Sequence, residues 1–157
     1  HFDHVMAAPA IAAASGADTG LHPGDRWLWD NVPLQLGMFG FPAVAPLAPP
    51  TRALADGDRL RFGRFEAHVL HTPGHTPGSC CFALEVAGED PLVFSGDTLF
   101  AGSIGRTDLW GGSFEDIVTS IRGPLFALSD PTRVIPGHGG ETTIGEERES
   151  NPFVGAR

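Results

Sequence analysis

Three apolar runs in the 157-residue chain end in the same way, and this repeated ending constrains the fold more than any other feature. Each run leads through a glycine into a histidine or an aspartate, in the segments 69–75, 92–97 and 134–138. Short apolar runs of this kind are typical of buried strands, and glycine allows a tight turn where a strand stops. Ligands placed just past strand ends can converge on one edge of a sheet. The pattern therefore predicts that His75, Asp97 and His138 gather at such an edge.

The other segments predict short helices and strands. Alternation of apolar and polar residues from Arg59 to Val69 indicates a β-hairpin, and the spacing of apolar residues over 114–128 indicates an amphipathic helix. Strands followed by helices in this order favour a layered α/β domain, which we expect to span residues 1–157. The remaining expectations are helices at 7–15, 25–36 and 142–149, strands at 19–22, 79–86, 92–94 and from 134, and an irregular loop at 38–50.

The charge balance narrows the classes of partner. Acidic residues number 19 against 10 lysines and arginines, which gives a formal net charge of -9. Such a surface repels phosphate backbones and anionic lipid, so we expect neither nucleic acid nor membrane as a partner. The longest apolar stretch, residues 5–14, is too short to span a bilayer. A small-molecule substrate is the expected partner.

The two cysteines, Cys80 and Cys81, are adjacent in the sequence. Neighbouring cysteines seldom pair, because the geometry of a disulfide is hard to close there. We interpret them as reduced thiols on a buried strand. Together with the absence of a basic and apolar leader pattern at the start of the chain, they predict a cytoplasmic protein.

The residue types after the three strands favour metal binding. Imidazole nitrogen and carboxylate oxygen together suit zinc, iron or manganese. A fourth group of the same types, His1, Asp3 and His4, opens the chain. Polar groups that merely cap turns would explain one of the strand-end residues, but not three.

Taken in order, these motifs resemble the metallo-β-lactamase superfamily. The matching segments are HFDH, HTPGHTPGS, SGDTLF and PGHG, over essentially the whole chain, and HTPGHTPGS, GSIGRTD and IGEERESNPF look like the small glyoxalase II-like enzymes. The resemblance implies a four-layer αββα sandwich. The family motif H-x-H-x-D-H begins with a histidine two positions before His1, and the family's first strands have no counterpart here. We therefore expect this chain to be an N-terminally truncated piece without its first strands.

The same resemblance implies a site for two divalent metal ions, with zinc as the first expectation and iron or manganese as alternatives. A hydroxide shared by the metals would attack an acyl thioester such as a hydroxyacyl-glutathione, or another ester, and Asp3 would orient it. By position, the ligands would be His1 and His75 for the first metal, Asp3, His4 and His138 for the second, and Asp97 between the two.

One pair of readings stays open at this stage. Arg106 and Asp108 form either a buried pair that supports the ligand loops or a plain surface ion pair. Four residues before His75, His71 is interpreted as a structural histidine, because Pro73 and Gly74 prevent a helix there.

Two rival functions also remain. The first is a persulfide dioxygenase-like enzyme with a single iron. The second is an inactive fragment, in which a missing ligand leaves the first metal under-coordinated and the absent strands expose an apolar sheet face. On that hypothesis we expect little or no activity until upstream residues are restored. A nuclease is disfavoured by the acidic charge.

Overall fold

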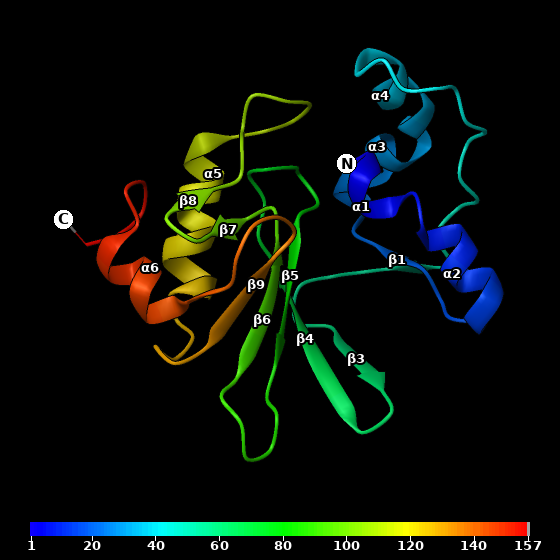
Figure 1. Ribbon diagram of the computed structural model, residues 1–157. Helices are drawn as coiled ribbons and strands as arrows, with labels where there is room; N and C mark the ends of the chain where they lie inside the picture. The colour runs from blue at the N-terminus through cyan, green and yellow to red at the C-terminus, as the bar shows by residue number, and fades with distance from the viewer. Residues whose placement is uncertain (157) are drawn as a thin grey trace. The chain divides into compact units, whose positions relative to one another are not determined.

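The computed structural model describes residues 1–156 and divides into two compact units, His1–Leu54 and a second unit that begins at Ala55 (Figure 1). Neither unit contains, among the described residues, a helix that is both long and apolar enough to cross a membrane. The elements of the first unit are α1 (Phe2–Val5), α2 (Ala8–Ser15), β1 (Gly20–Leu21), a 3₁₀ helix (Pro23–Asp25), α3 (Arg26–Asp30), α4 (Val32–Met38) and β2 (Arg52–Ala53).

The first unit is helical, with one short parallel pair, β1 and β2. The expected helix at 7–15 is confirmed as α2, and Gly16 ends it in the left-handed conformation at φ 70°. The expected helix at 25–36 is present as two helices that meet at Asn31. Pro33 lies in the first turn of α4, where its missing amide hydrogen removes no helical hydrogen bond. The chain from 41 to 50 has no regular structure, as predicted.

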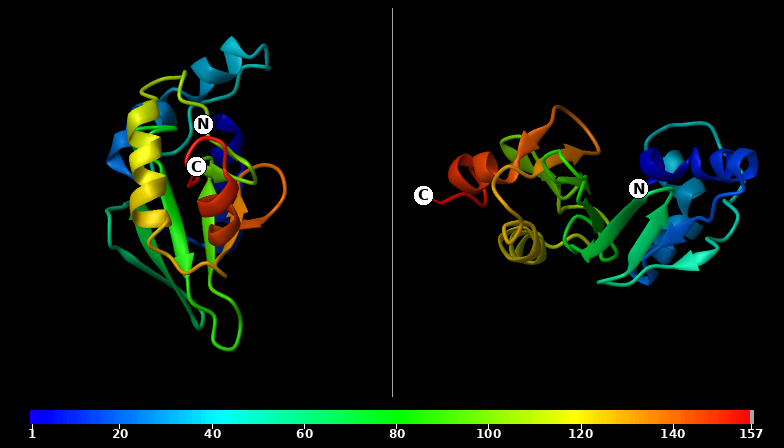
Figure 2. Two further views of the ribbon diagram at one scale, coloured as in Figure 1. Left: turned by 90° about the vertical axis from the view of Figure 1, so that its left-hand side faces the viewer. Right: turned by 90° about the horizontal axis from the view of Figure 1, so that it is seen from below.

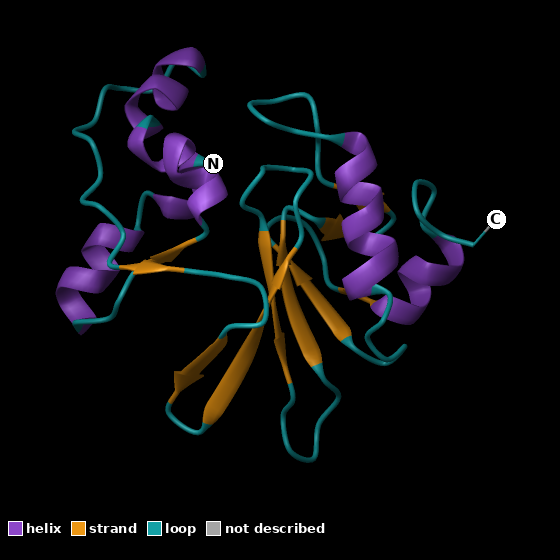
Figure 3. Cartoon of the chain, turned by 180° about the vertical axis from the view of Figure 1, so that it is seen from behind, coloured by secondary structure: helices purple, strands orange, loops and turns teal. Residues whose placement is uncertain are grey.

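The second unit is built on one six-stranded sheet, flanked by the short β7–β8 pair (Figures 1 and 3). The strand order is β10-β9-β6-β5-β4-β3, and every neighbouring pair is antiparallel except β6 and β9, which are parallel. Its elements are β3 (Arg59–Phe62), β4 (Phe65–His71), β5 (Cys80–Leu84), β6 (Leu92–Gly96), β7 (Leu99–Phe100), β8 (Ser103–Ile104), α5 (Phe114–Ser120), a π-helix (Ile121–Leu125), β9 (Arg133–Pro136), β10 (Thr142–Thr143) and α6 (Ile144–Ser150).

The core of this unit lies between the sheet and its helices. Figure 2 shows α5 running along the strands on one face. Alternate residues of each strand point to this face, and apolar residues of the helices meet them. Burying such side chains is the main stabilising term for the unit. The fully buried contacts include Cys81, Val93 and Val134 from the strands, and Ile117, Ile121 and Leu125 from the helices.

Two expectations about helices need correction. The single helix predicted over 114–128 changes at Ile121 into a π-helix, in which the amide of Phe126 donates to the carbonyl of Ile121 at 2.9 Å. Pro124 has no amide hydrogen, so the regular i→i−4 series cannot continue through it. In addition, Phe114 begins the apolar pattern that predicts this helix, but its side chain is 56% exposed.

The terminal helix predicted from Thr142 begins two residues later, at Ile144. Thr142 and Thr143 instead pair with β9 as the short strand β10. Thr143 then caps α6 through a capping box with Glu146, which explains why the helix starts where it does.

The cysteines give a first testable prediction. Both are free, and Cys81 is fully buried. Burial raises the pKa of the Cys81 thiol to about 11 from its ordinary 9.0. At about pH 8 its thiolate fraction is therefore about a hundredfold lower than that of an ordinary cysteine. We expect iodoacetamide to modify the partly exposed Cys80 in the native protein and Cys81 only in denaturant, as peptide mass spectrometry would measure. Equal labelling of both in the native state would contradict the burial of Cys81.

Candidate metal centre

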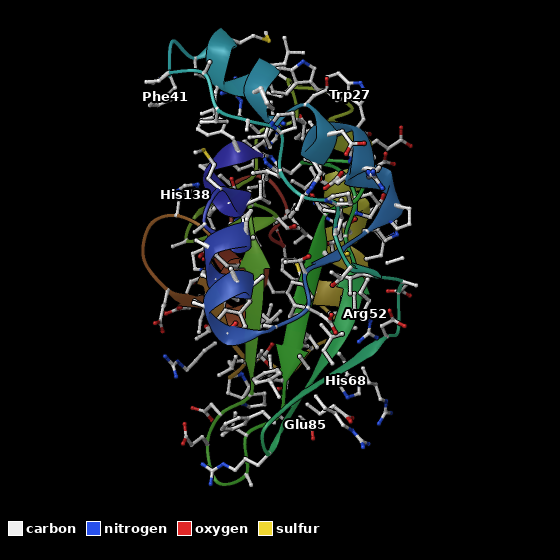
Figure 4. The ribbon with its side chains drawn as sticks, turned by 90° about the vertical axis from the view of Figure 1, so that its right-hand side faces the viewer. Trp27, Phe41, Arg52, His68, Glu85 and His138 are labelled. Atoms are coloured by element: carbon white, nitrogen blue, oxygen red, sulfur yellow. The ribbon has the colours of Figure 1, made fainter. Side chains whose placement is uncertain are left out.

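The strand topology brings three of the predicted ligands to one edge of the sheet. Because β4 and β6 are both antiparallel to β5, and β9 is parallel to β6, the carboxyl ends of β4, β6 and β9 lie at the same edge. His75, Asp97 and His138 follow these three strands. Figure 4 shows His138 in the loop beyond β9, at the opposite end of the sheet from Glu85, which follows β5.

The three side chains converge on one carboxylate oxygen. Nε2 of His75 and Nε2 of His138 each lie 3.7 Å from Oδ2 of Asp97. The side chains of His75 and Asp97 are 8% and 15% exposed, whereas that of His138 is 58% exposed. A separation of 3.7 Å is too long for a hydrogen bond. Ligands held about 2.0–2.2 Å from a tetrahedral cation lie about 3.4 Å apart, so the arrangement fits a divalent metal with small adjustments.

The hydrogen bond of His75 orients its imidazole for metal binding. Nδ1 of His75 lies 2.8 Å from the backbone carbonyl oxygen of Arg106. A carbonyl can only accept, so Nδ1 carries the proton and donates it. In the neutral ring Nε2 then keeps its lone pair, and this is the nitrogen that faces Asp97.

The loop that carries His75 is fixed against α5. The backbone amide of Ser113 donates to the carbonyl of Gly74 at 2.8 Å, and the hydroxyl of Ser120 donates to the carbonyl of Pro73 at 2.7 Å. Gly74 has φ 138° and packs directly against the backbone of α5, which leaves no room for a side chain. His75 is thus held on a rigid support.

His71 closes the base of the same loop. Its Nε2 lies 2.9 Å from the carbonyl oxygen of Pro77, and its amide donates to Oδ1 of Asp56 at 2.8 Å. These contacts agree with the interpretation of His71 as a structural histidine at a strand end.

The turns after β6 and β9 are tied to each other. A register shift between Phe94 and Gly96 interrupts the ladder, and Gly96 adopts φ 50°. The amide of Gly137 donates to the carbonyl of Gly96 at 2.8 Å. Asp97 and His138, each one residue further along, are therefore held close together by the backbone.

The first unit holds the fourth predicted group on α1. Nε2 of His4 lies 3.5 Å from Oδ2 of Asp3, and both side chains are about one-third exposed, at 31% and 38%. The amide of Phe2 donates to Oε1 of the fully buried Gln35 at 3.0 Å, which ties α1 to α4. Asp3 and His4 thus lie together on an anchored helical turn, open to solvent.

His1 directly precedes α1 and is partly buried. Its ring nitrogen Nε2 is buried, and the residue lines a cavity of about 50 Å³ together with Asp25, Leu28 and Trp29, among others. This places His1 beside Leu28 and Trp29 of α3.

The pair formed by Arg106 and Asp108 lies at the surface, which is the second of the two readings that the sequence left open. Nε of Arg106 lies 2.7 Å from Oδ1 of Asp108, and the two side chains are 54% and 68% exposed. The hydrogen bond from Arg106 lowers the pKa of Asp108 to about 2. Arg106 contacts His75 through its backbone carbonyl, which accepts the hydrogen bond from Nδ1. The sequence analysis did not predict this contact.

Comparison with known proteins is consistent with this geometry. Residues 1–138 match the family model described as the metallo-beta-lactamase superfamily. The chain belongs to this superfamily. A hydroxyacylglutathione hydrolase named GloC, from Haemophilus influenzae, is 39% identical over 158 residues, which cover 100% of this chain and 73% of the relative.

Solved structures agree on the fold. The BLEG-1 B3 metallo-beta-lactamase superposes with a TM-score of 0.87 at 36% identity, over 98% of this chain and 73% of its own. TTHA1623, solved in a di-iron-bound form, gives a TM-score of 0.83 at 40% identity with the same coverage. The expected α/β metallo-β-lactamase fold is confirmed, and this fold implies binding of divalent metal.

Proposed function

We propose that this protein is a metal-dependent hydrolase of acyl thioesters, with hydroxyacyl-glutathione as the first substrate to test. The observation that carries the proposal is the position of two imidazole nitrogens, each 3.7 Å from the same oxygen of Asp97. The relative from Haemophilus influenzae supports the thioester, since its name specifies hydroxyacylglutathione. The net charge of -9 supports a small-molecule thioester or ester over nucleic acid.

Six residues would hold two divalent metals, with zinc proposed first and iron or manganese as alternatives. Divalent metals lower the pKa of a bound water to about 7 and polarise a carbonyl oxygen. The proposed ligands are His1 and His75 for one metal, Asp3, His4 and His138 for the other, and Asp97 between the two.

The protein's own groups prepare this chemistry. The carbonyl of Arg106 fixes the tautomer of His75, so that a lone pair is available at Nε2. Asp97 supplies negative charge in a largely buried position, with a side chain 15% exposed. The carboxylate of Asp3 is exposed enough to accept a hydrogen bond from the attacking water.

We further propose that the reaction takes place in the cytoplasm, where thiol carriers remain reduced.

The test is hydrolysis of S-lactoylglutathione by the full-length protein, followed by loss of thioester absorbance. We expect turnover that disappears after chelation and returns when zinc, iron or manganese is restored, with two metals per chain by elemental analysis. Absence of any metal-dependent turnover on this thioester would count against the substrate class. A single iron per chain, with oxygen uptake on a persulfide substrate, would support the dioxygenase rival instead.

A further inference from the structure

A buried carboxylate in α6 lies at the centre of a hydrogen-bond network that the proposed chemistry does not use. Glu147 is 3% exposed. Its Oε1 accepts from the hydroxyl of Thr142 at 2.7 Å, and its Oε2 accepts from the amide of Gly102 at 3.0 Å. Oε2 also accepts from Nδ2 of Asn151 at 2.6 Å.

Asn151 extends this network to the same distant segment. It is 1% exposed, and its Nδ2 also donates to the carbonyl of Ser103 at 3.0 Å. Its Oδ1 accepts from the amide of Phe153 at 3.0 Å. One side chain from α6 and one from the residue that follows its last turn therefore hold two consecutive residues, Gly102 and Ser103, where the β7–β8 turn enters β8.

The segment that they hold supports two of the proposed ligands. Three residues after Ser103, the carbonyl of Arg106 accepts the hydrogen bond from Nδ1 of His75. Between them, Gly105 packs against the carbonyl of Asp97, and a Cβ at Gly105 would lie 3.3 Å from the Cβ of His75. Any shift of the 102–106 segment must therefore move the support of both side chains.

A buried carboxylate contributes little to the free energy of unfolding by itself. Removing a charge from water is costly, and apolar side chains of similar volume often stabilise a fold equally well or better. Its hydrogen bonds have directions, however, and these fix the backbone of the segment in one position. The geometry therefore favours a role in positioning over a role in simple helix packing.

We infer that Glu147 and Asn151 are positioning residues of the metal centre, which hold the 102–106 segment so that His75 and Asp97 are oriented to bind metal. The inference rests on the ligand roles proposed above for His75 and Asp97. Both act through backbone groups, Glu147 through the amide of Gly102 and Asn151 through the carbonyl of Ser103.

The experiment compares Glu147→Gln with Glu149→Gln, an exposed position on the same helix. Zinc affinity is measured in the full-length protein by competition with a chromophoric chelator. The ligand-field spectrum of the cobalt-substituted protein reports ligand geometry, and urea unfolding of the metal-free protein reports stability. Glutamine carries no charge and has only one acceptor oxygen, so it cannot accept hydrogen bonds on both sides of the network as Glu147 does.

For Glu147→Gln we expect zinc affinity to fall by about 10-fold to 100-fold, the range typical of residues that orient metal ligands, with a changed cobalt spectrum. For Glu149→Gln we expect affinity within about twofold of wild type and an unchanged spectrum. A Glu147→Gln protein that is less stable when metal-free but binds zinc as tightly as wild type would overturn the inference, because α6 would then serve packing only.

Two milder variants keep the test decisive if Glu147→Gln does not fold. Thr142→Val removes one hydrogen bond from Glu147, and Asn151→Ser removes the amide that reaches Ser103. Zinc affinity unchanged in both would overturn the inference, and reduced affinity in both would support it. Failure of wild type to hydrolyse thioesters, with affinity still lowered in the variants, would overturn only the proposed function. A wild type that binds no metal would overturn both.

Discussion

Replacement of Asp97 by asparagine is expected to lower kcat/KM for thioester hydrolysis by a factor of about 10³ and to reduce the bound metal per chain. Oδ2 of Asp97 faces both His75 and His138, at 3.7 Å from each Nε2. Asparagine is nearly the same size but carries no charge, and it cannot present two equivalent anionic oxygens. Elemental analysis and steady-state kinetics measure the two effects.

The matched control is Asp108→Asn. Asp108 is also an aspartate of the ligand-loop region, but its side chain is 68% exposed and pairs with Arg106 at the surface. Because exposed ion pairs contribute little, we expect activity and metal content within about twofold of wild type. Urea unfolding of both variants without metal separates loss of a ligand from loss of the fold. An Asp97→Asn enzyme with full metal content and near-normal kcat/KM would remove Asp97 from the proposed site.

The ligands that sequence analysis predicted in the second unit are those with a local signal. His75, Asp97 and His138 each follow a short apolar run and a glycine, and each is found beyond the end of a strand. The sequence does not specify strand order, but any sheet in which these strands run the same way places the three side chains at one edge. The observed order, with β4 and β6 on either side of β5, satisfies this condition.

The support of the site was harder to predict, because much of it is backbone. The carbonyl of Arg106 orients His75, yet a carbonyl has no signature in the sequence. Glu147 lies in the run Glu146 to Glu149, which is typical of an exposed helix surface. A weak signal was present, since Ile144, Glu147 and Asn151 share one face at spacings of three and four residues, but nothing marked the middle residue as buried.

The errors in secondary structure also have physical causes. Apolar spacing continues through Pro124, so periodicity alone does not reveal that the hydrogen-bond pattern changes there to that of a π-helix. Thr142 and Thr143 belong to a strand of only two residues, which is too short to show any alternation. Their pairing with β9 is a tertiary contact, and tertiary contacts decide such short elements.

Substitution of Gly105 by alanine is expected to lower the free energy of unfolding by about 3 kcal/mol and to weaken metal binding as well. A Cβ at this position would overlap the carbonyl of Asp97 and approach the Cβ of His75 to 3.3 Å. Gly105 is buried and its φ is not positive, so the effect comes from lack of space rather than from backbone strain. The backbone of Asp97 cannot yield without moving its carboxylate. Urea unfolding and chelator competition measure the two losses.

Gly123→Ala is the matched control for this substitution. Gly123 lies in the π-helix of the same unit, and nothing stands within 4 Å of the Cβ that alanine would add. Replacing glycine with alanine where the side chain fits reduces the entropy of the unfolded chain, so we expect an unchanged stability or a gain of up to about 1 kcal/mol. A Gly105→Ala protein that is as stable as Gly123→Ala and binds metal normally would contradict the close packing of Gly105 against the carbonyl of Asp97. The inference that Glu147 orients the proposed ligands through the 102–106 segment would then also be wrong, because Gly105 is the residue of this segment that packs against Asp97.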